Sequence, residues 1–560
     1  MRLGPLSLRG PLSAIAVPLA CVAAAALLFV SSSSRESALP SFWDAAEDAE
    51  LARSIVSAMT DEELLAQTLM FGWAGEDPSP LVVSWVRDRA LGSIKVFGWN
   101  TDDTVKVARS VRLLQENAAA GRFSIPLFVA TDQEGGWIRH IKGNTSETPG
   151  NLAIGASGVP ADAWYSGFYI SRELAALGIN LNFAPTVDLY TDHESTVIGT
   201  RSFGEDPVAA GVLGAAFVAG SRAAGVLTTA KHYPGHGDTG LDSHGRLPVI
   251  GISRKTLFER ELVPFDILIK SGVSAVMPGH LCFPRVTGTN EPATFSREFI
   301  GNILKKELGF DGLVITDDIM MNGATEYAGS VSRAVQLAIE AGNDIVESST
   351  TPGFGDAFWT ATLQKMSGSP AFRARVADAA RRVLEAKLAY FKDDSAVPIL
   401  PDVSKIPERV PDREGGRFFL SQAVRSVTLV RGELKPVAAR GKGTVIAGAY
   451  PAFLEEGKRR FPDAKASPLN DSFLNLARSA DTVILCLSSK DQRGYLWELR
   501  RLGKRVIVVS AQSPVLLNDI PPVEAAIAVY GYSHWSFKAA FGAISGDFVP
   551  TGTMPVKDVR

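Results

Sequence analysis

The apolar run GLVITDD, residues 312–318, ends in two adjacent carboxylates, Asp317 and Asp318. A short apolar run with β-branched residues predicts a buried strand. A carboxylate at the end of such a strand is costly unless it has partners or a chemical task. Neighbouring residues of a strand point to opposite sides, so we expect only one of the two to face a central site. The alternative for Asp318 is to cap the following helix.

Seven further runs of this kind accompany it, and longer helix-like stretches separate them. They are QTLMF from residue 67, GSIKVF from 92, PLFVAT from 126, INLNFAP from 179, VLTTAKH from 226, SAVMPGH from 274 and NDIVES from 343. Strands that alternate with helices indicate a parallel sheet. Eight such strands predict an α/β fold of the (β/α)8 TIM-barrel type.

Polar residues stand at or just past the C-terminal ends of these runs. They are Asp132, Asp188, Lys231, His232, His280, Asp317 and Asp318. In a TIM barrel this rim carries the active site. Solvated charges without such a role would be expected on helix faces instead.

The composition is that of a globular protein with more than one folded unit. The chain has 560 residues, 46% of them hydrophobic and 21% charged, and a formal net charge of -3. This balance gives no indication of nucleic-acid binding. Cys21, Cys282 and Cys486 form no disulfide framework and no pair at metal-ligand spacing.

The N-terminal segment differs from the rest of the chain. Arg2 and Arg9 precede an uncharged apolar run over residues 13–30, and SSSSRES follows. This pattern is typical of an export signal, and its length also suits a membrane anchor. Cys21 suggests a lipoprotein, but Pro18 and the apolar residues after the cysteine fit a lipobox poorly. We expect an exported protein that is periplasmic, cell-surface or membrane-anchored.

Four regions are predicted along the chain. Residues 1–40 form the signal peptide or membrane anchor with a polar spacer, and residues 41–392 form the barrel. Its first helices include one with Thr60 as N-cap, and its last helix ends near Phe391. Residues 393–415 are a proline-rich linker. Residues 416–560 form a smaller open α/β sandwich domain, with the β-rich runs SVTLV, GTVIAGA, DTVILCL, KRVIVVS and AAIAVY and no nucleotide-binding motif.

The stretch KHYPGHGDTGLDSH, residues 231–244, holds three of the seven histidines of the chain. Lys231 and His232 end the fifth strand, and a loop rich in glycine leads to Asp242 and His244. A carboxylate two positions from an imidazole can pair with it, fix its tautomer and make it a general acid/base. A metal site that used His232, His236 and His244 matches no zinc spacing, and Lys231 would repel the cation. We therefore expect no metal.

Two further loops carry candidate ligand-binding residues. DQEGGWIRH follows the third strand and contains Asp132, which can accept hydrogen bonds from hydroxyl groups. GTRSFGEDP follows the fourth strand and contains Arg201, whose planar guanidinium presents N–H donors in a fixed geometry. The alternative for Arg201 is a loop salt bridge with Glu205 or Asp206.

These motifs together resemble glycoside hydrolase family 3. KHYPGHGDTGLDSH, ITDDIMM, DQEGG, RSFGEDP and LGFDGLVITDD are similar, more narrowly, to its bacterial β-N-acetylglucosaminidases, roughly over residues 55–392. The resemblance implies an exported retaining exo-glycosidase. It would hydrolyse terminal β-N-acetylglucosamine from cell-wall or chitin-derived saccharides, without a cofactor.

The resemblance also implies a role for each matching residue. Asp317 is the nucleophile that forms a covalent glycosyl intermediate, and His244, oriented by Asp242, is the acid/base. The sugar is held by Asp132, Arg201, Lys231, His232 and His140. Trp137 and His140 stand where the family has arginines, which bears on the preference for N-acetylhexosamine.

Three alternatives remain. The same mechanism could act on a β-glucoside or β-xyloside. The chain could be a degenerate hydrolase that binds wall saccharides without cleaving them, although its catalytic set is intact. It could also be a metal-dependent barrel hydrolase. In each case the partner is a saccharide or glycan and not a nucleic acid.

Overall fold

The computed structural model describes residues 1, 39–100, 102–195, 197–240 and 245–559. Residues 41–560 form one compact unit. The predicted export segment with Cys21 and the predicted pair Asp242 and His244 lie outside the described residues. Within the residues that are described, no helix has the length and apolarity needed to cross a membrane.

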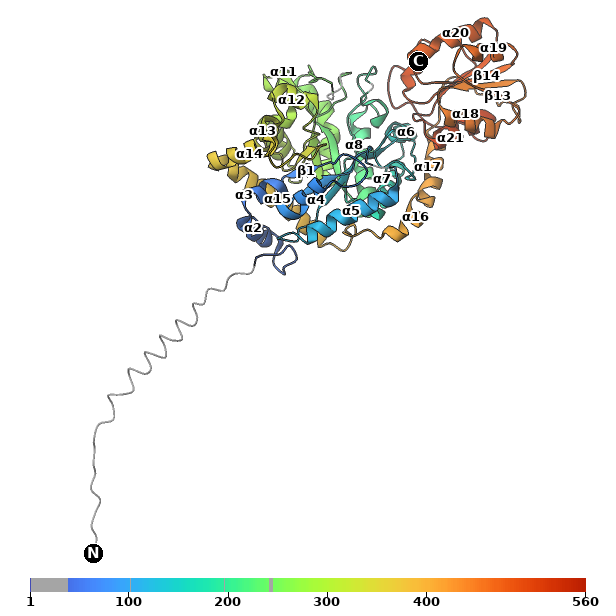
Figure 1. Ribbon diagram of the computed structural model, residues 1–560. Helices are drawn as coiled ribbons and strands as arrows, with labels where there is room; N and C mark the ends of the chain where they lie inside the picture. Colours follow the sequence, from blue (N-terminus) through green and yellow to red (C-terminus); the bar gives the residue numbers. More distant parts are fainter. Residues whose placement is uncertain (2–38, 101, 196, 241–244, 560) are drawn as a thin grey trace. The chain divides into compact units, whose positions relative to one another are not determined.

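A curled parallel sheet forms the centre of the N-terminal region (Figure 1). Its eight described strands are β1 (Leu69–Phe71), β2 (Ser93–Lys95), β3 (Phe128–Thr131), β6 (Leu181–Asn182), β7 (Leu227–Tyr233), β8 (Ala275–Pro278), β9 (Leu313–Val314) and β10 (Val346–Ser348). They pair in the order β10-β1-β2-β3-β6-β7-β8-β9. A parallel bridge between Ile315 and Ile345 joins the two outer strands. The sheet therefore closes on itself, and the predicted barrel class is confirmed.

Helices surround this sheet in Figure 1. In the described part of the barrel region they are α2 (Asp48–Ala58), α3 (Asp61–Gln67), α4 (Pro80–Arg89), α5 (Thr104–Ala119), α6 (Asn151–Ser157), α7 (Pro160–Ala176), η1 (Gly199–Arg201), α8 (Pro207–Ala223), α9 (Arg254–Thr256), η2 (Leu257–Glu261), α10 (Leu262–Lys270), α11 (Pro284–Thr287), η3 (Ala293–Phe295), η4 (Glu298–Glu307), α12 (Asn322–Ala328), α13 (Val331–Ala341), α14 (Ala357–Gly368) and α15 (Pro370–Phe391). Thr60 caps α3 in a reciprocal capping box with Glu63, as its sequence predicts. The last helix ends at Phe391, whose ring packs on Phe128 of β3 at 5.9 Å.

A second sheet of six strands occupies the C-terminal region. In spatial order the strands are β11 (Thr428–Gly432), β16 (Ala525–Ala528), β15 (Arg505–Ser510), β14 (Thr482–Leu487), β12 (Thr444–Gly448) and β13 (Lys465–Pro468). All neighbours are parallel except β11 and β16. Successive residues of β14 belong in turn to the two core clusters on either side of the sheet, with Leu485 in one and Ile484 in the other. Both faces of the sheet are therefore buried.

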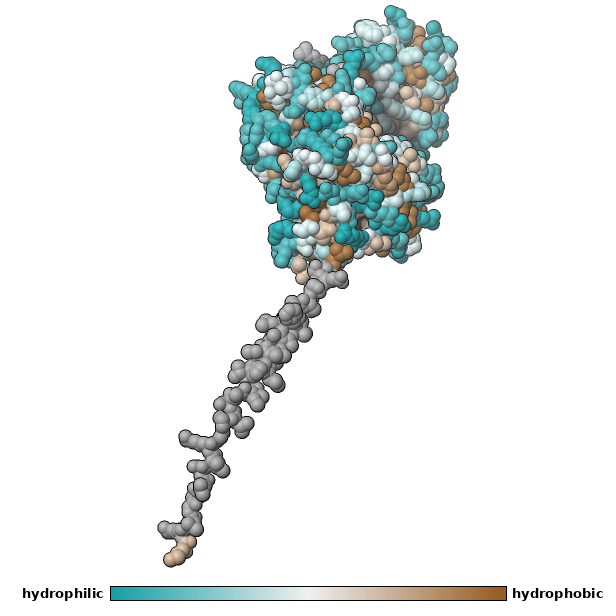
Figure 2. All heavy atoms as spheres, turned by 60° about the vertical axis from the view of Figure 1, so that its left-hand side comes forward, coloured by the Kyte–Doolittle hydropathy of each residue, from teal (hydrophilic) through white to brown (hydrophobic). Residues whose placement is uncertain are grey.

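Helices and short turns complete this second region. They are η5 (Val403–Lys405), α16 (Ile406–Arg409), α17 (Arg413–Ser426), α18 (Pro451–Arg460), α19 (Asp471–Arg478), η6 (Lys490–Gln492), α20 (Arg493–Arg501), η7 (Pro514–Leu517) and α21 (His534–Ser545). The hairpin strands β4 (Gln133–Gly135) and β5 (Ile138–Arg139) belong to the barrel rim. The face seen in Figure 2 is mainly hydrophilic, with apolar residues scattered between polar ones.

The side chain of Lys387 in α15 is fully buried at the N-terminal end of the barrel strands. Its Nζ donates to the carbonyl oxygen of Gly92 at 2.7 Å and to Oε1 of Gln67 at 3.3 Å. Burial lowers the pKa of the Lys387 ammonium to about 7. The folded protein thus binds this proton more weakly than the unfolded chain does.

A stability measurement over pH tests this assignment. The pKa of Lys387 is lower in the folded protein than in the unfolded chain. The wild type therefore loses stability as the pH falls from the pKa of an unfolded lysine to about 7, because the unfolded chain takes up this proton first. We expect Lys387→Met to remove that loss. The unfolding free energy of the variant minus that of the wild type should fall by a few kcal/mol as the pH rises from 7 toward 10. Urea unfolding at a series of pH values measures it. For Lys392→Met, at the exposed C-cap of the same helix, the difference in unfolding free energy from the wild type should not change with pH. The same pH dependence for both variants would contradict the assignment.

Candidate active site

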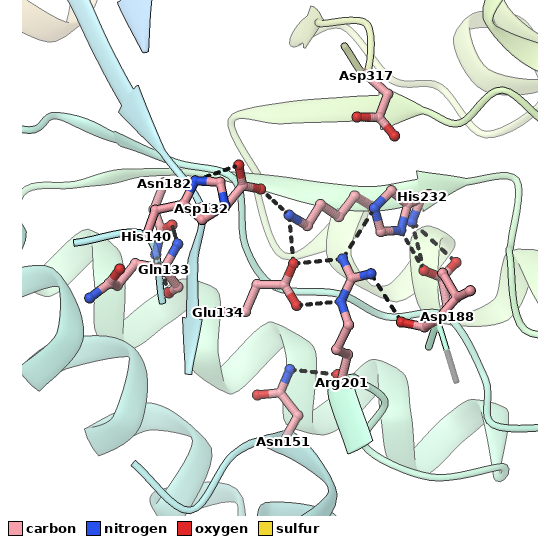
Figure 3. Close-up of polar contacts among 12 residues, drawn as sticks. Asp132, Gln133, Glu134, His140, Asn151, Asn182, Asp188, Arg201, His232 and Asp317 are labelled. Atoms are coloured by element: carbon pink, nitrogen blue, oxygen red, sulfur yellow. Dashed lines mark hydrogen bonds and ion pairs between the residues drawn. The ribbon is translucent and has the colours of Figure 1, made fainter. Parts of the chain in front are cut away.

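Buried charges from three strands and from the residue between β3 and β4 meet at the C-terminal rim of the barrel (Figure 3). Asp132, between β3 and β4, pairs with Lys231 of β7 and with Lys95 of β2, the latter at 2.9 Å. Lys231 also lies 2.7 Å from Glu134 of β4. Each of the four side chains is nearly excluded from solvent. Buried charges of this kind need partners, and here each carboxylate meets a cation.

The hairpin that carries two of these carboxylates depends on paired glycines. Gly135 and Gly136 have φ values of 95° and 60°, a region that favours glycine. A Cβ at Gly136 would stand 3.2 Å from the Cα of Gly150, so the chain passes close there. The turn brings Asp132 and Glu134 to the same cluster, which explains the EGG sequence.

Arg201 extends the cluster through a bidentate ion pair. Its Nε and Nη2 lie 2.9 and 2.7 Å from the two carboxylate oxygens of Glu134, a geometry that fixes the guanidinium plane. Nη2 also lies 3.3 Å from Nε2 of His232. Attraction to Glu134 keeps the pKa of Arg201 raised although burial opposes it. Burial likewise opposes ionisation of Glu134, but Arg201 and Lys231 lower the pKa of its carboxyl to about 2.

The alternative partners expected for Arg201 are wrong. Glu205 lies 3.4 Å from His193, and the side chain of Asp206 accepts from the backbone of α8 as its N-cap. The true partner, Glu134, is 67 positions away in sequence. Arg201 therefore faces the predicted sugar-binding residues, and within its own loop it donates from Nη1 to the carbonyl oxygen of Val197 at 3.2 Å.

His232 is oriented by the buried carboxylate of Asp188. Asp188 follows β6 and accepts from Nδ1 of His232 at 2.7 Å and from its backbone N at 3.1 Å. It also accepts from the backbone N of His236 at 2.7 Å. Burial lowers the pKa of His236 to about 4, so its ring is neutral near pH 7. The first half of the KHYPGHG motif is thus a rigid support built on Asp188.

The described residues also bear on the metal hypothesis. Among them, no three or more His, Cys, Asp or Glu side chains are grouped so that they could hold a metal ion. The ring of His232 is already shared by Asp188 and Arg201. His244, the third ligand of that hypothesis, lies outside the described residues.

Asp317 and Asp318 lie past the end of β9 and have different surroundings. Oδ1 of Asp318 accepts from the backbone N of Met320 and of Ser349, each at 3.0 Å. The Asp318 side chain thus holds its own loop and the loop after β10 together. It does not cap α12, which has no side-chain cap. Oδ1 of Asp317 accepts from the backbone N–H of Asp318 at 2.9 Å.

The Asp317 carboxylate is ionised at neutral pH. In Figure 3 it is turned toward the cluster that contains His232. Burial would raise the pKa of Asp317, but attraction to His232, His280 and Lys95 outweighs it and lowers the pKa to about 2. Asp317 stays partly exposed. It is therefore an accessible anion beside a rigid set of donors.

His140 and Trp137 take separate places. Nδ1 of His140 lies 3.5 Å from Oδ2 of Asp132, so His140 lies beside the charged cluster. Burial lowers the pKa of His140 to about 4, so it is neutral there at neutral pH. Trp137, between β4 and β5, is 41% exposed and lines a cavity beside the cluster.

Sequence reasoning missed Lys95, Glu134 and Glu347. Lys95 interrupts the apolar run GSIKVF, and Glu347 interrupts NDIVES. A charge inside a buried strand is the same signal that identified Asp317. Applied to every run, it would have found both residues.

Lys95 and Glu347 form a buried pair behind Asp132. Nζ of Lys95 lies 2.7 Å from Oε1 of Glu347, whose side chain is wholly buried. Burial, with repulsion from Asp318 and Asp132, raises the pKa of Glu347 to about 8 despite attraction to Lys95. Lys95 thus contacts Asp132 and Glu347 at once, which fixes a second lysine beside Asp132.

A double-mutant cycle tests this pairing. Lys95→Met should cost about 3–5 kcal/mol of stability at pH 9, because Asp132 loses one of its cations and Glu347 loses the attraction that favours its ionised form, so that the buried carboxyl must take up a proton. The Lys95→Met/Glu347→Gln variant should lose about 1–3 kcal/mol less unfolding free energy than the two single variants lose together. Urea unfolding of the four proteins measures the coupling. Additive losses would contradict the pairing.

Comparisons with known proteins show which family the chain resembles. The family described as "Glycosyl hydrolase family 3 N terminal domain" matches residues 59–386. The "Beta-hexosaminidase A" of Pseudoalteromonas piscicida is 35% identical over 270 residues, which are 46% of this chain and 45% of that protein. The chain thus matches less than half of that relative's length. The "Beta-hexosaminidase" of Thiobacillus denitrificans is 33% identical over 302 residues, 51% of this chain and 81% of the relative.

A solved structure extends the likeness to both sheets. It is a glycoside hydrolase family 3 beta-N-acetylglucosaminidase from Paenibacillus sp. str. FPU-7, with a TM-score of 0.80 and 29% identity. The match covers 89% of this chain and 99% of that one. The chain therefore belongs to glycosyl hydrolase family 3, as its motifs predicted, and is a glycoside hydrolase.

Proposed function

We propose that this protein is an exported retaining exo-glycosidase that removes terminal β-N-acetylglucosamine from cell-wall or chitin-derived saccharides. The observation that carries the proposal is the ionised, partly exposed Asp317 carboxylate beside a buried set of charged donors. The names of the relatives, beta-hexosaminidase and beta-N-acetylglucosaminidase, support the choice of sugar.

The proposed reaction has two steps. Asp317 attacks the anomeric carbon, the glycosidic bond breaks, and His244 gives its proton to the leaving oxygen. His244 then takes a proton from water, and the oxygen of that water attacks the anomeric carbon and releases Asp317. Two inversions give net retention. Asp242 orients the imidazole in both steps.

The charged cluster holds the sugar in place during both steps. The ammonium of Lys231 has three N–H donors, and its described contacts with Asp132 and Glu134 use two of them. The third donor of Lys231, the carboxylate of Asp132 and the second N–H of Arg201 Nη1 are available to hydroxyl groups of the substrate; the other donors of Arg201 are directed at Glu134, His232 and Val197. Because the protein already fixes them, they need little reorganisation when the sugar binds.

A panel of nitrophenyl glycosides tests the activity. We expect kcat/KM for the β-N-acetylglucosaminide to exceed those for the β-glucoside and β-xyloside at least about tenfold. NMR of the first-formed product should show the β-anomer, and chelators should have no effect. A preference for the glucoside would favour the glucosidase alternative, and binding without turnover would favour the degenerate one.

His244→Ala tests the assignment of the acid/base. We expect kcat/KM to fall about 10²–10⁴-fold for substrates with a poor leaving group. The loss should be much smaller for a dinitrophenyl glycoside, because that leaving group departs without protonation. Steady-state rates over a series of leaving groups measure this. His236→Ala, on the same motif but with a neutral ring, should show no such dependence. A loss that is equal for every leaving group would contradict the role of His244.

Export rests on the sequence of residues 1–40. We expect a fusion of these residues to direct a reporter out of the cytoplasm. Fractionation of the cells then distinguishes a cleaved signal from a retained anchor. A reporter that stays in the cytoplasm would contradict export.

A further inference from the structure

Residues 552–557 of the second domain fold back onto the barrel, and we call this segment the strap. The N–H of Gly552 donates to the carbonyl oxygen of Val427 at 3.0 Å, which ties the strap to the second domain. The next residue already contacts the barrel, because the N–H of Thr553 donates to the carbonyl oxygen of Ala156 in α6 at 2.8 Å. The strap therefore connects the second domain to α6.

Packing holds the strap in the same place. Val556 is 3% exposed and belongs to a core cluster that contains residues of both domains. The barrel contributes Leu152 and Ala153 of α6 to this cluster, and the second domain contributes Leu485 of β14. Because the Val556 side chain is removed from water there, the strap is held by apolar burial as well as by its backbone bonds.

The strap also contacts the loop that carries Arg201. The N–H of Glu205 donates to the carbonyl oxygen of Pro555 at 3.1 Å, and Nζ of Lys557 lies 3.2 Å from Oε1 of Glu205. A Cβ at Gly204 would stand 2.6 Å from the carbonyl oxygen of Pro555, and the φ of Gly204 is 139°. Only glycine suits this conformation and this close approach. The loop after Arg201 is therefore built to lie against the strap.

The helix α6 holds the same loop from its other side. Nδ2 of Asn151 donates to the carbonyl oxygen of Arg201 at 2.8 Å. A Cβ at Gly155 would stand 1.8 Å from the carbonyl oxygen of Phe203, so the backbones of α6 and the loop are in contact. Since the strap is bound to α6 as well, the Arg201 loop is fixed between the two.

The carboxylate of Glu205 joins the strap to a third segment. Its Oε1 faces Lys557, and its Oε2 lies 3.4 Å from Nε2 of His193. Next to His193, the N–H of Asp192 donates to the carbonyl oxygen of Gly237 at 3.0 Å. The Glu205 side chain is 12% exposed, so the surrounding chain confines it. Glu205 therefore connects the strap, its own loop and the segment that supports the loop after β7.

We propose that the strap positions Arg201 for the sugar, with Glu205 as the positioning residue that joins them. The second domain thus acts on sugar binding from outside the site, through the backbone of the Arg201 loop. A displacement of about 1 Å in a binding group is enough to lower a rate about 10²-fold. This inference rests on the proposed function, because it assigns a support to one of the sugar-holding residues.

A cycle of variants of the full-length protein tests the link. The substrate is dinitrophenyl β-N-acetylglucosaminide, whose good leaving group keeps slow variants measurable. We expect Glu205→Ala to lower kcat/KM at least about threefold when Arg201 is present. In the Arg201→Met background the same change should lower kcat/KM less than about 1.5-fold, because no guanidinium is left to be positioned. A residue that serves stability alone would give the same loss in both backgrounds.

Glu524→Ala is the matched control. Nη2 of Arg505 lies 2.6 Å from Oε1 of Glu524 within the second domain, where their side chains are 28% and 24% exposed. Loss of this ion pair should leave kcat/KM within about 1.5-fold of the wild type. A chain that ends at Gly552 loses the contacts of the strap with α6 and Glu205, and should show the same dependence on Arg201. It decides in place of Glu205→Ala if the melting temperature shows that variant to be unfolded.

The outcomes separate the two proposals. A loss below about threefold for Glu205→Ala, or an equal loss in the two backgrounds, would overturn the inference. The same loss in Glu524→Ala would overturn it as well, because the effect would then follow from weakening the second domain in general. Failure of the wild type to cleave the nitrophenyl glycoside would instead overturn the proposed function, on which the inference rests.

Discussion

Asp317→Ala is expected to lose kcat/KM by about 10⁴-fold or more on the nitrophenyl β-N-acetylglucosaminide. The reason is chemical, because no neighbouring carboxylate can form the glycosyl bond in its place. Asp318 is held by two backbone N–H groups and is turned away from this role. The melting temperature should stay close to that of the wild type, because the Asp317 side chain supports little of the surrounding structure.

Asp318→Asn is the matched control. The amide oxygen of Asn can still accept from Met320 and Ser349, so the two loops remain fastened. We expect its activity to stay within about tenfold of the wild type. Azide should partly restore turnover of Asp317→Ala and give a glycosyl azide of inverted configuration. Equal losses in the two variants would contradict the assignment of Asp317.

Asp132→Ala is expected to lose both stability and activity. It leaves Lys231 and Lys95 buried with one carboxylate fewer between them, which should cost about 3–5 kcal/mol of unfolding free energy. It also removes an acceptor for the sugar and loosens Lys231, so kcat/KM should fall about 10³-fold. Attraction to the two lysines holds the pKa of Asp132 well below its usual value although burial opposes this, so the pair is ionised across the neutral range.

A surface ion pair provides the comparison for Asp132. Glu76 pairs with Lys106 where both side chains are at least 40% exposed. Glu76→Ala should therefore change stability by less than about 1 kcal/mol and leave activity unaffected. Urea unfolding and steady-state kinetics measure both variants. Equal effects of Asp132→Ala and Glu76→Ala would contradict the buried network.

The barrel could be predicted from sequence because its signals are local. Seven of the eight strands lie within the predicted apolar runs and β7 extends one residue past its run, and helix boundaries such as Thr60 follow from capping chemistry. The strand β13 was not predicted, because it is an edge strand with mostly exposed residues and lacks the apolar run. The hairpin of β4 and β5 was also missed, because its five residues form strands only through contact with each other.

The pairings in the site could not be predicted in the same way. Asp132, Lys231, His232 and Arg201 were identified from their places after strands, and the structure brings them together. Their partners depend on contacts over long stretches of chain. Lys95 and Glu347 are 252 positions apart, and only the closed barrel makes them neighbours. The positions of Asp242 and His244 lie outside the described residues and stay a prediction.

The central claim is that Asp317 forms a covalent bond to the sugar. A fluorinated N-acetylglucosaminide with a good leaving group slows the second step, so that the glycosyl protein accumulates. Intact mass spectrometry followed by peptide mapping should show one glycosyl unit, attached to the peptide that contains Asp317, and no label in Asp317→Asn. A label on another residue, or turnover with inverted product and no label, would contradict the mechanism.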